Sequence, residues 1–314
     1  MEQRREVVEQ FMGQGVSVAM LCEFAGISKS CFYYSKQEKT QPQKGRPVPG
    51  FTVNRDGAIV LDKTIEELLK AYRKEPEFMS SGGYYKLSKY LAVEHGFYIN
   101  HKKIYRICDE NKLLLFKQDL SKPKKKQKKR CVYKEVSGAN QLWQFDIKYG
   151  YVHGESKWFF VLAFIDVFSK KVTGYYIGKS CKAGDLVFTL NQALKDENIT
   201  ASHNLKIRSD NGPQMSSNKF YFYLKRLEQK LEHEFIPPRT PDRNAFIEAF
   251  FSILEMELLQ ARYFKTFKEA YETVTDFICF YNNRRLHGSI GFKSPKMFLE
   301  GIKKGEILQN VISA

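Results

Sequence analysis

The sequence predicts an α/β fold, preceded by small all-helical units. From residue 141 the sequence pattern changes from that of helices to that of strands. Three strand patterns follow one another, and helix and strand patterns then alternate. Two earlier segments have the apolar spacing of helices instead. Because antiparallel strands followed by alternating helix and strand pack in layers, we expect one sheet with helices on both faces.

The composition points to a polyanionic partner. The 314 residues, 43% of them apolar, are enough for two or three domains, and the formal net charge is +16. That surplus suits nucleic acid or an acidic membrane surface. No apolar run reaches the ~18 residues of a spanning helix, and the start, MEQRREVVEQ, lacks the apolar centre of a signal peptide. We therefore expect a cytoplasmic, nucleoid-associated bacterial protein that binds double-stranded DNA and no membrane.

The cysteines indicate reduced thiols. They are scattered, with no C-x-x-C pair, whereas a disulfide framework or a zinc knuckle needs closer spacing. His95, His101 and Cys108 fall in one region, but the second Cys of a zinc site is missing. The six are Cys22, Cys31, Cys108, Cys131, Cys181 and Cys279.

Residues 1–36 read as a helix-turn-helix-like segment. Ser17 and Ser28 are candidate N-caps, and Gly26 lies in the turn between two helices. Such a unit places its second helix in a DNA major groove, although helix pairs also serve purely for packing.

Three further segments precede the strand-rich region. Residues 37–60 are rich in Pro and Gly and read as a linker. Residues 61–118 read as a second helix-turn-helix-like domain, with a helix broken at Gly96 and another capped by Asn100. Residues 119–136 form a basic linker, whose like charges repel and whose expected role is phosphate neutralisation, with a solubilising segment as the alternative. Its predicted DNA-binding residues are Lys124, Lys125, Lys126, Lys128, Lys129 and Arg130.

Residues 137–300 form the expected catalytic core, and residues 301–314 a C-terminal tail. Strands are predicted at LWQFDIKYGYV, KWFFVLAFIDVF, KKVTGYYIG, LKIRSDNG and LEHEFIPP. Helices are predicted at 182–196, 217–229, 243–262 and 266–283.

Three carboxylates in this core lie in apolar surroundings. Asp146 interrupts the first strand, Asp210 closes the fourth, and Glu248 lies one turn into a long helix. An Asp inside a strand is disfavoured, and a buried unpaired carboxylate is costly, so each needs a partner. Singly, each also fits an ordinary turn or a solvent-facing helix. Together, on strand, strand and helix, they predict a catalytic metal site.

Mg²⁺ is the expected cofactor, with Mn²⁺ as an alternative. Mg²⁺ prefers oxygen ligands and bridges carboxylates to substrate phosphates. Two such ions, roughly 3.5–4 Å apart, can activate an attacking oxygen and stabilise a leaving one. Three acids can hold both ions when one acid bridges.

The order and wording of the motifs resemble the insertion-sequence-three family of bacterial transposases, specifically the product of the second reading frame. The resemblance covers nearly the whole chain, with the core at about 141–300. It implies a ribonuclease-H-like, retroviral-integrase-type core preceded by helix-turn-helix regions. The phrases that carry it are FIDVFSKKVTGYY, SDNGPQ, TPDRNAFIEAFFSILEMEL and YNNRRLHGSIGFKSPKMF.

The resemblance implies that Asp146, Asp210 and Glu248 are the family's acidic triad, which cleaves element ends and transfers the 3′-hydroxyl to target DNA. The 37 residues between Asp210 and Glu248 exceed the family's usual 35. Glu255 stands where many relatives carry Lys or Arg, and it is a competing acid. The flanking NAFIEAFF favours Glu248.

The same resemblance places Arg284, Arg285 and His287 beside bound DNA, although a basic loop after a helix is the plain alternative. It also implies self-association on DNA and an active species fused to the upstream-frame product. Two other functions stay open: a nuclease of the same fold that does not rejoin strands, and a DNA-binding regulator with vestigial acids.

Overall fold

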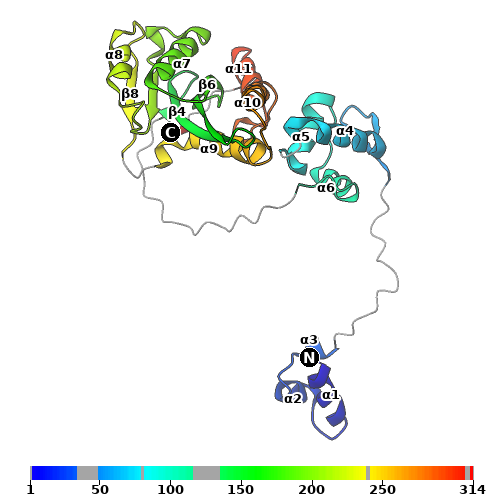
Figure 1. The fold of residues 1–314 in the computed structure, drawn as a ribbon. Coiled ribbons are helices and arrows are strands. Elements are labelled where there is room, and N and C mark those ends of the chain that lie inside the picture. The colour runs from blue at the N-terminus through cyan, green and yellow to red at the C-terminus, as the bar shows by residue number, and fades with distance from the viewer. Residues whose placement is uncertain are drawn as a thin grey trace. The chain divides into compact units, whose positions relative to one another are not determined.

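The computed structural model describes residues 2–33, 49–78, 81–115, 135–237, 241–307 and 312–313. The chain divides into two compact units, residues 1–49 and 50–314 (Figure 1). None of the described helices is long and apolar enough to cross a membrane.

The first unit contains three short helices. Ser17 caps the second by accepting from the Met20 amide, and Ser28 accepts from the Cys31 amide at the start of the third. Gly26, in the turn between these two helices, has a φ of +65°, in the left-handed region that favours glycine. The predicted caps and turn are therefore confirmed. The helices are α1 (Glu2–Phe11), α2 (Val18–Phe24) and α3 (Lys29–Tyr33).

The second unit begins with a hairpin and three helices. Its α-helices pack through a buried apolar cluster that includes Ile65, Leu69 and Leu87. The expected ends are confirmed: Gly96 ends one helix with a φ of +71°, and Asn100 caps the next. The linker prediction is wrong beyond residue 50, because residues 51–61 form an antiparallel hairpin. The elements are β1 (Phe51–Val53), β2 (Ile59–Leu61), α4 (Asp62–Lys74), η1 (Pro76–Phe78), α5 (Tyr84–His95) and α6 (His101–Glu110).

A five-stranded mixed sheet organises the rest of the unit. Its order is β6-β5-β4-β7-β8, with β4, β5 and β6 antiparallel and β4, β7 and β8 parallel. This arrangement confirms the predicted α/β class. The strands are β4 (Leu142–Val152), β5 (Lys157–Asp166), β6 (Val172–Gly178), β7 (Lys206–Ser209) and β8 (Glu232–Phe235).

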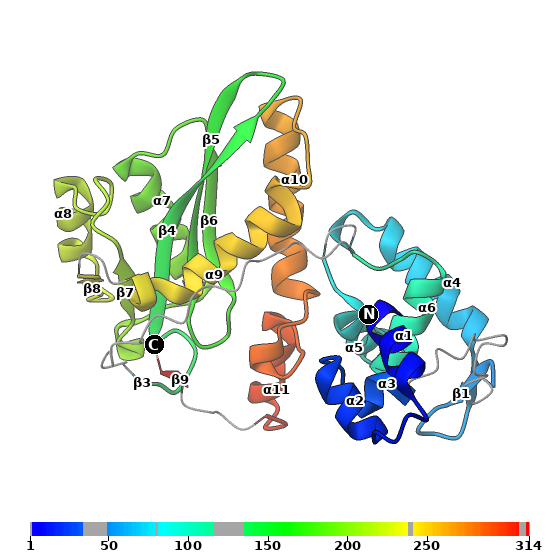
Figure 2. The same ribbon diagram turned by 90° about the horizontal axis from the view of Figure 1, so that it is seen from below.

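Helices cover both faces of the sheet, as Figures 1 and 2 show. On one face Trp143 and Phe145 of β4 share an apolar cluster with α7 and α8. On the other face Val161 and Ala163 of β5 share a cluster with α9 and α10. The helix predicted at 243–262 ends at Leu254 and continues as a π-helical turn, Glu255–Leu259. The helices are α7 (Ala183–Asp196), η2 (Ala201–His203), α8 (Asn218–Arg226), η3 (Pro241–Asn244), α9 (Ala245–Leu254), α10 (Phe267–Asn283), η5 (Gly288–Ile290) and α11 (Pro295–Lys303).

Two boundaries of the predicted core need correction. Residues 135–136 and 312–313, placed in the basic linker and the C-terminal tail, form the antiparallel pair β3 (Glu135–Val136) and β9 (Ile312–Ser313). Val136 is buried against Leu142 of the central strand. The compact part of the core therefore extends beyond 137–300 at both ends.

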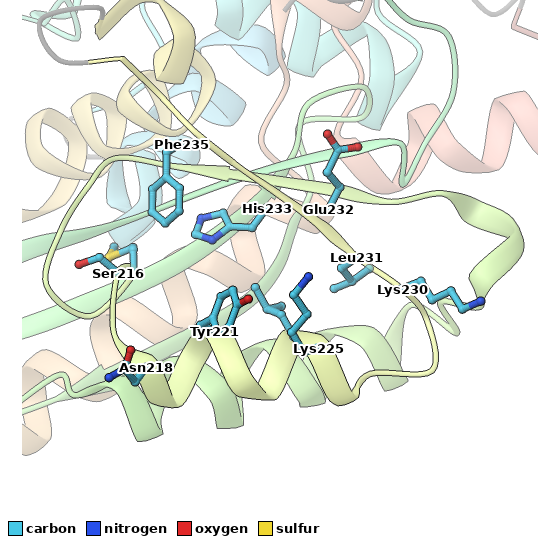
Figure 3. Close-up of a pocket in the computed structure, with 11 residues that line it drawn as sticks. Ser216, Asn218, Tyr221, Lys225, Lys230, Leu231, Glu232, His233 and Phe235 are labelled. Carbon is cyan, nitrogen blue, oxygen red and sulfur yellow. The ribbon is translucent and has the colours of Figure 1, made fainter.

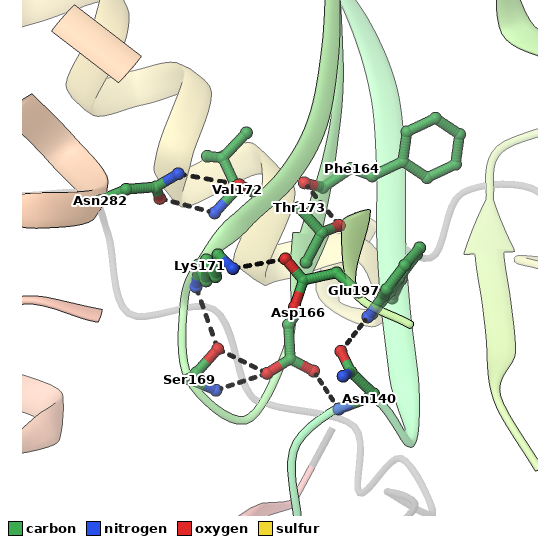
Figure 4. A network of polar contacts seen from close by, with 10 residues as sticks. Asn140, Phe164, Asp166, Ser169, Lys171, Val172, Thr173, Glu197 and Asn282 are labelled. Carbon is green, nitrogen blue, oxygen red and sulfur yellow. Dashed lines mark hydrogen bonds and ion pairs between the residues drawn. The ribbon is translucent and has the colours of Figure 1, made fainter. Parts of the chain in front are cut away.

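A buried carboxylate explains part of the phrase FIDVFSKKVTGYY (Figure 4). Asp166, at the end of β5, accepts from the Ser169 amide (2.8 Å), the Ser169 hydroxyl (2.6 Å) and the Asn140 amide (3.0 Å). Burial raises the pKa of Asp166, while these hydrogen bonds oppose the rise. This acid therefore holds the turn after β5 against the start of β4.

We expect Gly174→Ala to destabilise the protein. A Cβ at this position of β6 would lie 2.7 Å from the Cβ of Ala193 on α7, so the helix would have to move. Overpacking of this kind costs about 1–3 kcal/mol, which urea denaturation can measure. In a protein that already carries Ala193→Gly, the Gly174→Ala change should cost less stability, because the Cβ that it would meet is gone. If Gly174→Ala costs the same with Ala193 and with Gly at that position, this contact is not the cause of the loss.

Candidate active site

Asp146 lies in the middle of β4, on the face that α9 covers. It stands opposite Ala163 of β5, and its Oδ1 accepts from the Ile147 amide at 2.7 Å. Burial raises the pKa of Asp146 to about 6; the Ile147 hydrogen bond opposes the rise, and the charges of Asp210 and Glu248 add to it. Asp210 and Glu248 are therefore near enough to act electrostatically on Asp146.

The sheet register places Asp210 beside Asp146. Strands β4 and β7 are parallel neighbours, and their paired register ends with Gln144 opposite Arg208. Asp146 lies two residues beyond Gln144 on β4, and Asp210 lies two residues beyond Arg208, directly after the end of β7. The Gly212 amide donates to Asp210 Oδ1 at 3.0 Å, so the carboxylate is held within its own turn, at the carboxyl edge of the sheet.

The carbonyl of Arg243 links both strands to the start of α9. Gln144 donates to this oxygen at 2.9 Å, and Arg208 donates to it at 3.1 Å. The side-chain oxygen of Gln144 also accepts from the Phe246 and Ile247 amides, at 3.0 and 3.2 Å. These bonds satisfy first-turn amides that have no partner within the helix. They fix the turn that precedes Glu248.

An open hollow of about 450 Å³ lies between β4 and α9. Asp146 and Glu248 line it together with Lys148 and Glu255, whose side chains form an ion pair of 3.0 Å. Asp210 is not part of this lining and approaches from the neighbouring strand. The hollow therefore combines two of the predicted acids with one basic and one further acidic side chain.

The acids fit a divalent cation by charge and ligand chemistry. Across the described ranges, no three His, Cys, Asp or Glu side chains already stand at the spacing of a metal centre. The charges of Asp210 and Glu248 help to raise the pKa of Asp146, and a cation would offset this excess of negative charge. Glu248 is exposed, so its side chain can rotate toward the other two. Holding one ion requires that the three carboxylates turn toward a common point.

The basic residues predicted to contact DNA have two different outcomes. Those in the basic linker, Lys124, Lys125, Lys126, Lys128, Lys129 and Arg130, lie outside the described residues. Arg284, Arg285 and His287 lie in the segment that follows α10, and the structure shows all three.

These three side chains make internal contacts. Arg284 forms ion pairs with Glu75 and Glu94 of the α4–α5 region. Arg285 is buried and holds Glu257 of the π-helical turn through two hydrogen bonds, of 2.9 and 2.6 Å. His287 is buried as well, and burial holds its pKa far below the usual range.

The burial of Arg285 and His287 does not fit the predicted contact with DNA. A buried guanidinium with a carboxylate partner stabilises packing and presents no surface to a phosphate. Arg285 and His287 are therefore structural here, and Arg284 connects the helical segment to the core.

Sequence reasoning missed three residues of the site. Gln144 and Arg208 each lie two positions before an acid, and Lys148 lies two positions after Asp146. Side chains two apart on a strand share a face, so a period-two search around each acid would have found them. Nothing in the sequence signals that the first two converge on one carbonyl.

Two family profiles, both described as integrase core domain, match residues 136–241 and 229–295. Together they span half of the chain. Residues 136–295 thus form an integrase core domain.

Proteins of bacterial insertion elements are similar to this chain in sequence. An uncharacterised 39.2 kDa protein of insertion element IS476 from Xanthomonas euvesicatoria is 24% identical, over 95% of this chain and 77% of its own. The transposase of IS904 from Lactococcus lactis is 26% identical over 52% of this chain, and InsF of IS3A from Escherichia coli is 29% identical over 52%. These matches span 63% and 55% of the two transposases. The chain is thus similar to transposases of insertion elements and carries an integrase core domain.

Solved catalytic cores of integrases and transposases superpose on this structure with low TM-scores. The HTLV-2 integrase core in complex with magnesium has a TM-score of 0.37 at 14% identity, covering 51% of this chain and 96% of its own. The Mos1 mariner transposase catalytic domain has a TM-score of 0.39 at 16% identity, covering 52% and 76%.

We expect Asp146→Asn to stabilise the metal-free protein at pH 7.5 and to have little effect at pH 4. The raised pKa means that the folded protein binds this proton more tightly than the unfolded chain between about pH 4 and 6. Ionisation above that window costs stability, by roughly 2 kcal/mol for a partly exposed group.

Thermal denaturation at the two pH values in EDTA measures this difference. Added Mg²⁺ should raise the melting temperature of the wild type more than that of the variant. A variant less stable than wild type at pH 7.5 would contradict the assignment of Asp146 as a destabilising acid.

Proposed function

We propose that the chain is a DNA transposase that cleaves phosphodiester bonds at the ends of an insertion element and joins the 3′-hydroxyl to target DNA. Asp146, Asp210 and Glu248 hold the catalytic cation, Mg²⁺ or Mn²⁺. The observation that carries this proposal is the convergence of Gln144 and Arg208 on the Arg243 carbonyl, which ties the three elements bearing these acids. The transposase relatives support it independently.

The chain's own groups have distinct parts in this chemistry. Bound cations, two if one acid bridges, would activate the attacking oxygen and stabilise the leaving oxygen of the phosphodiester. Asp146 and Asp210 supply carboxylates from the rigid sheet, and Glu248 supplies one from a helix that is fixed at its first turn. With a pKa of about 6, Asp146 is mostly ionised at neutral pH even before a cation arrives.

DNA is the proposed substrate of both steps. The net charge of +16 provides nonspecific attraction to the phosphate backbone. Cleavage at two element ends calls for more than one copy of the chain, so self-association on DNA is part of the proposal. Fusion to the upstream-frame product and a nucleoid-associated cytoplasmic location are further parts.

We expect Asp210→Asn to lower cleavage of element-end DNA by more than about 100-fold, because loss of even an outer-shell metal partner costs 10–100-fold. The assay incubates full-length protein with Mg²⁺ and an end-labelled duplex that carries the terminal sequence of the element encoding this chain. Asp196→Asn, the same change at an exposed position of α7, is the matched control and should retain activity.

The products separate the alternative functions. Equal cleavage by wild type and Asp210→Asn would refute the proposed site. Cleavage without joined product would favour the nuclease. Binding without cleavage, even after the upstream-frame product is added, would favour the regulator.

We expect Lys148 to contact the DNA phosphate that enters the hollow. It is the basic residue in that lining, and Glu255 holds its side chain beside Asp146 and Glu248. Lys148→Glu should weaken duplex binding and reduce the slope of log affinity against log salt by about 1. Adding Glu255→Lys should restore the slope, because it returns one positive charge to the hollow.

Fluorescence anisotropy in EDTA measures these slopes without cleavage. The matched control exchanges the charges of Lys179 and Glu155, an ion pair also of 3.0 Å that lies outside the hollow. If the Lys148–Glu255 pair is purely structural, its variants and those of the Lys179–Glu155 pair will change the melting temperature and leave the salt slope of DNA binding unchanged. That result would contradict the expected phosphate contact of Lys148.

A further inference from the structure

A second and larger cavity lies between α8 and the edge strand β8 (Figure 3). Its volume is about 730 Å³, within the 300–1,000 Å³ of typical small-ligand sites. Figure 3 shows Tyr221 and Lys225 rising from α8 toward the strand, with His233 and Phe235 facing them from β8.

Aromatic faces line this cavity and are open to solvent. Tyr221 is 54% exposed and Phe235 is 45% exposed, values unusual for large rings in one concave site. The ring of His233 lies 4.1 Å from that of Phe235, centre to centre, and burial lowers the pKa of His233 to about 4. The uncharged His233 ring packs against Phe145 and Phe220 and supports Phe235, so the rings open to a ligand are those of Tyr221 and Phe235.

The charge of the lining is positive. Lys225 and Lys230 line the cavity, and no carboxylate in the described part of the chain forms an ion pair with either. The acid in the lining, Glu232, pairs with Lys206, which lies outside the cavity. An anionic ligand with a flat aromatic group would complement this combination.

Hydrogen bonds connect the cavity to the catalytic edge of the sheet. His233 bonds to the hydroxyl of Ser209 at 2.9 Å, and Ser209 directly precedes Asp210. The Ile236 amide, next after Phe235, donates to the Ser209 carbonyl at 2.9 Å. The Asn211 side chain donates to the Ile236 carbonyl at 3.2 Å. A ligand here would lie next to the turn that carries Asp210.

We propose that this cavity binds one unpaired nucleotide of DNA, with its base stacked on Tyr221 and Phe235 and its phosphate near Lys225. The inference rests on the proposed function only in taking DNA as the substrate. Stacking on aromatic side chains is the sequence-tolerant way in which proteins hold single-stranded bases, and lysines along the rim follow the backbone. The cavity thus selects DNA that is frayed or single-stranded beside the bond to be cut.

The test compares two duplexes of identical sequence, one blunt and one with a four-nucleotide 5′ overhang containing 2-aminopurine. Full-length protein binds them in EDTA, so cleavage does not contribute. Wild type should prefer the overhang by about tenfold and change the 2-aminopurine emission. Tyr221→Ala should abolish both effects, and Lys225→Gln should lower the salt slope by about 1.

Phe222→Ala is the matched control. Phe222 neighbours Tyr221 on α8 and is similarly exposed, at 56%, but it does not line the cavity. This variant should retain the preference and the emission change. The proposal is overturned if wild type shows no preference for the overhang, or if Tyr221→Ala and Phe222→Ala behave alike.

This outcome is independent of the proposed function. A protein that prefers the overhang through Tyr221 but never cleaves DNA would uphold the cavity and refute the transposase. A protein that cleaves and joins DNA but does not prefer the overhang would uphold the transposase and refute the nucleotide-binding cavity.

Discussion

The carbonyl oxygen of Arg243 is the point on which the site depends. It accepts hydrogen bonds from Gln144 on one strand and Arg208 on the next, each two residues before a predicted catalytic acid. Arg208 is itself held by Glu234 of β8, through contacts of 3.1 and 3.0 Å. Three strands and one helix therefore share a single network. The positions of the acids follow from backbone register, and the carboxylates need no bonds to one another.

The sequence predicts the elements of the core well because each carries a local signal. The apolar run LWQFDIKYGYV becomes β4, and the caps Ser17, Asn100 and Gly96 act where expected. The short pair β3 and β9 escapes prediction, because two-residue strands some 175 residues apart depend on tertiary contact. The hairpin at residues 51–61 is hidden by its neighbours, because Pro42, Pro47 and Pro49 give the preceding segment the composition of a linker, whereas Asp56-Gly57 is a hairpin turn signal.

The sequence points to the candidate acids directly, and it says less about the surroundings of the basic residues. A carboxylate in an apolar strand is anomalous by itself, so Asp146 was conspicuous. An arginine after a helix is ordinary, and its direction depends on partners that the sequence does not pair. Arg285 is matched with Glu257, and Arg284 with Glu75 and Glu94, far away along the chain. Lys148 stands in the hollow beside Glu255, so the positive charge of the hollow comes from strand β4.

The π-helical turn at Glu255–Leu259 forms the last turn of the long helix that begins at Ala245. A π-turn behaves as a one-residue insertion in an α-helix, and each residue of an α-helix turns the chain by about 100°. Removing one residue within this turn would rotate everything beyond it and separate Glu257 from Arg285, while Glu248 kept its place. The turn thus sets the direction of Glu257 separately from that of Glu248, so the contact with Arg285 depends on a feature that does not position Glu248.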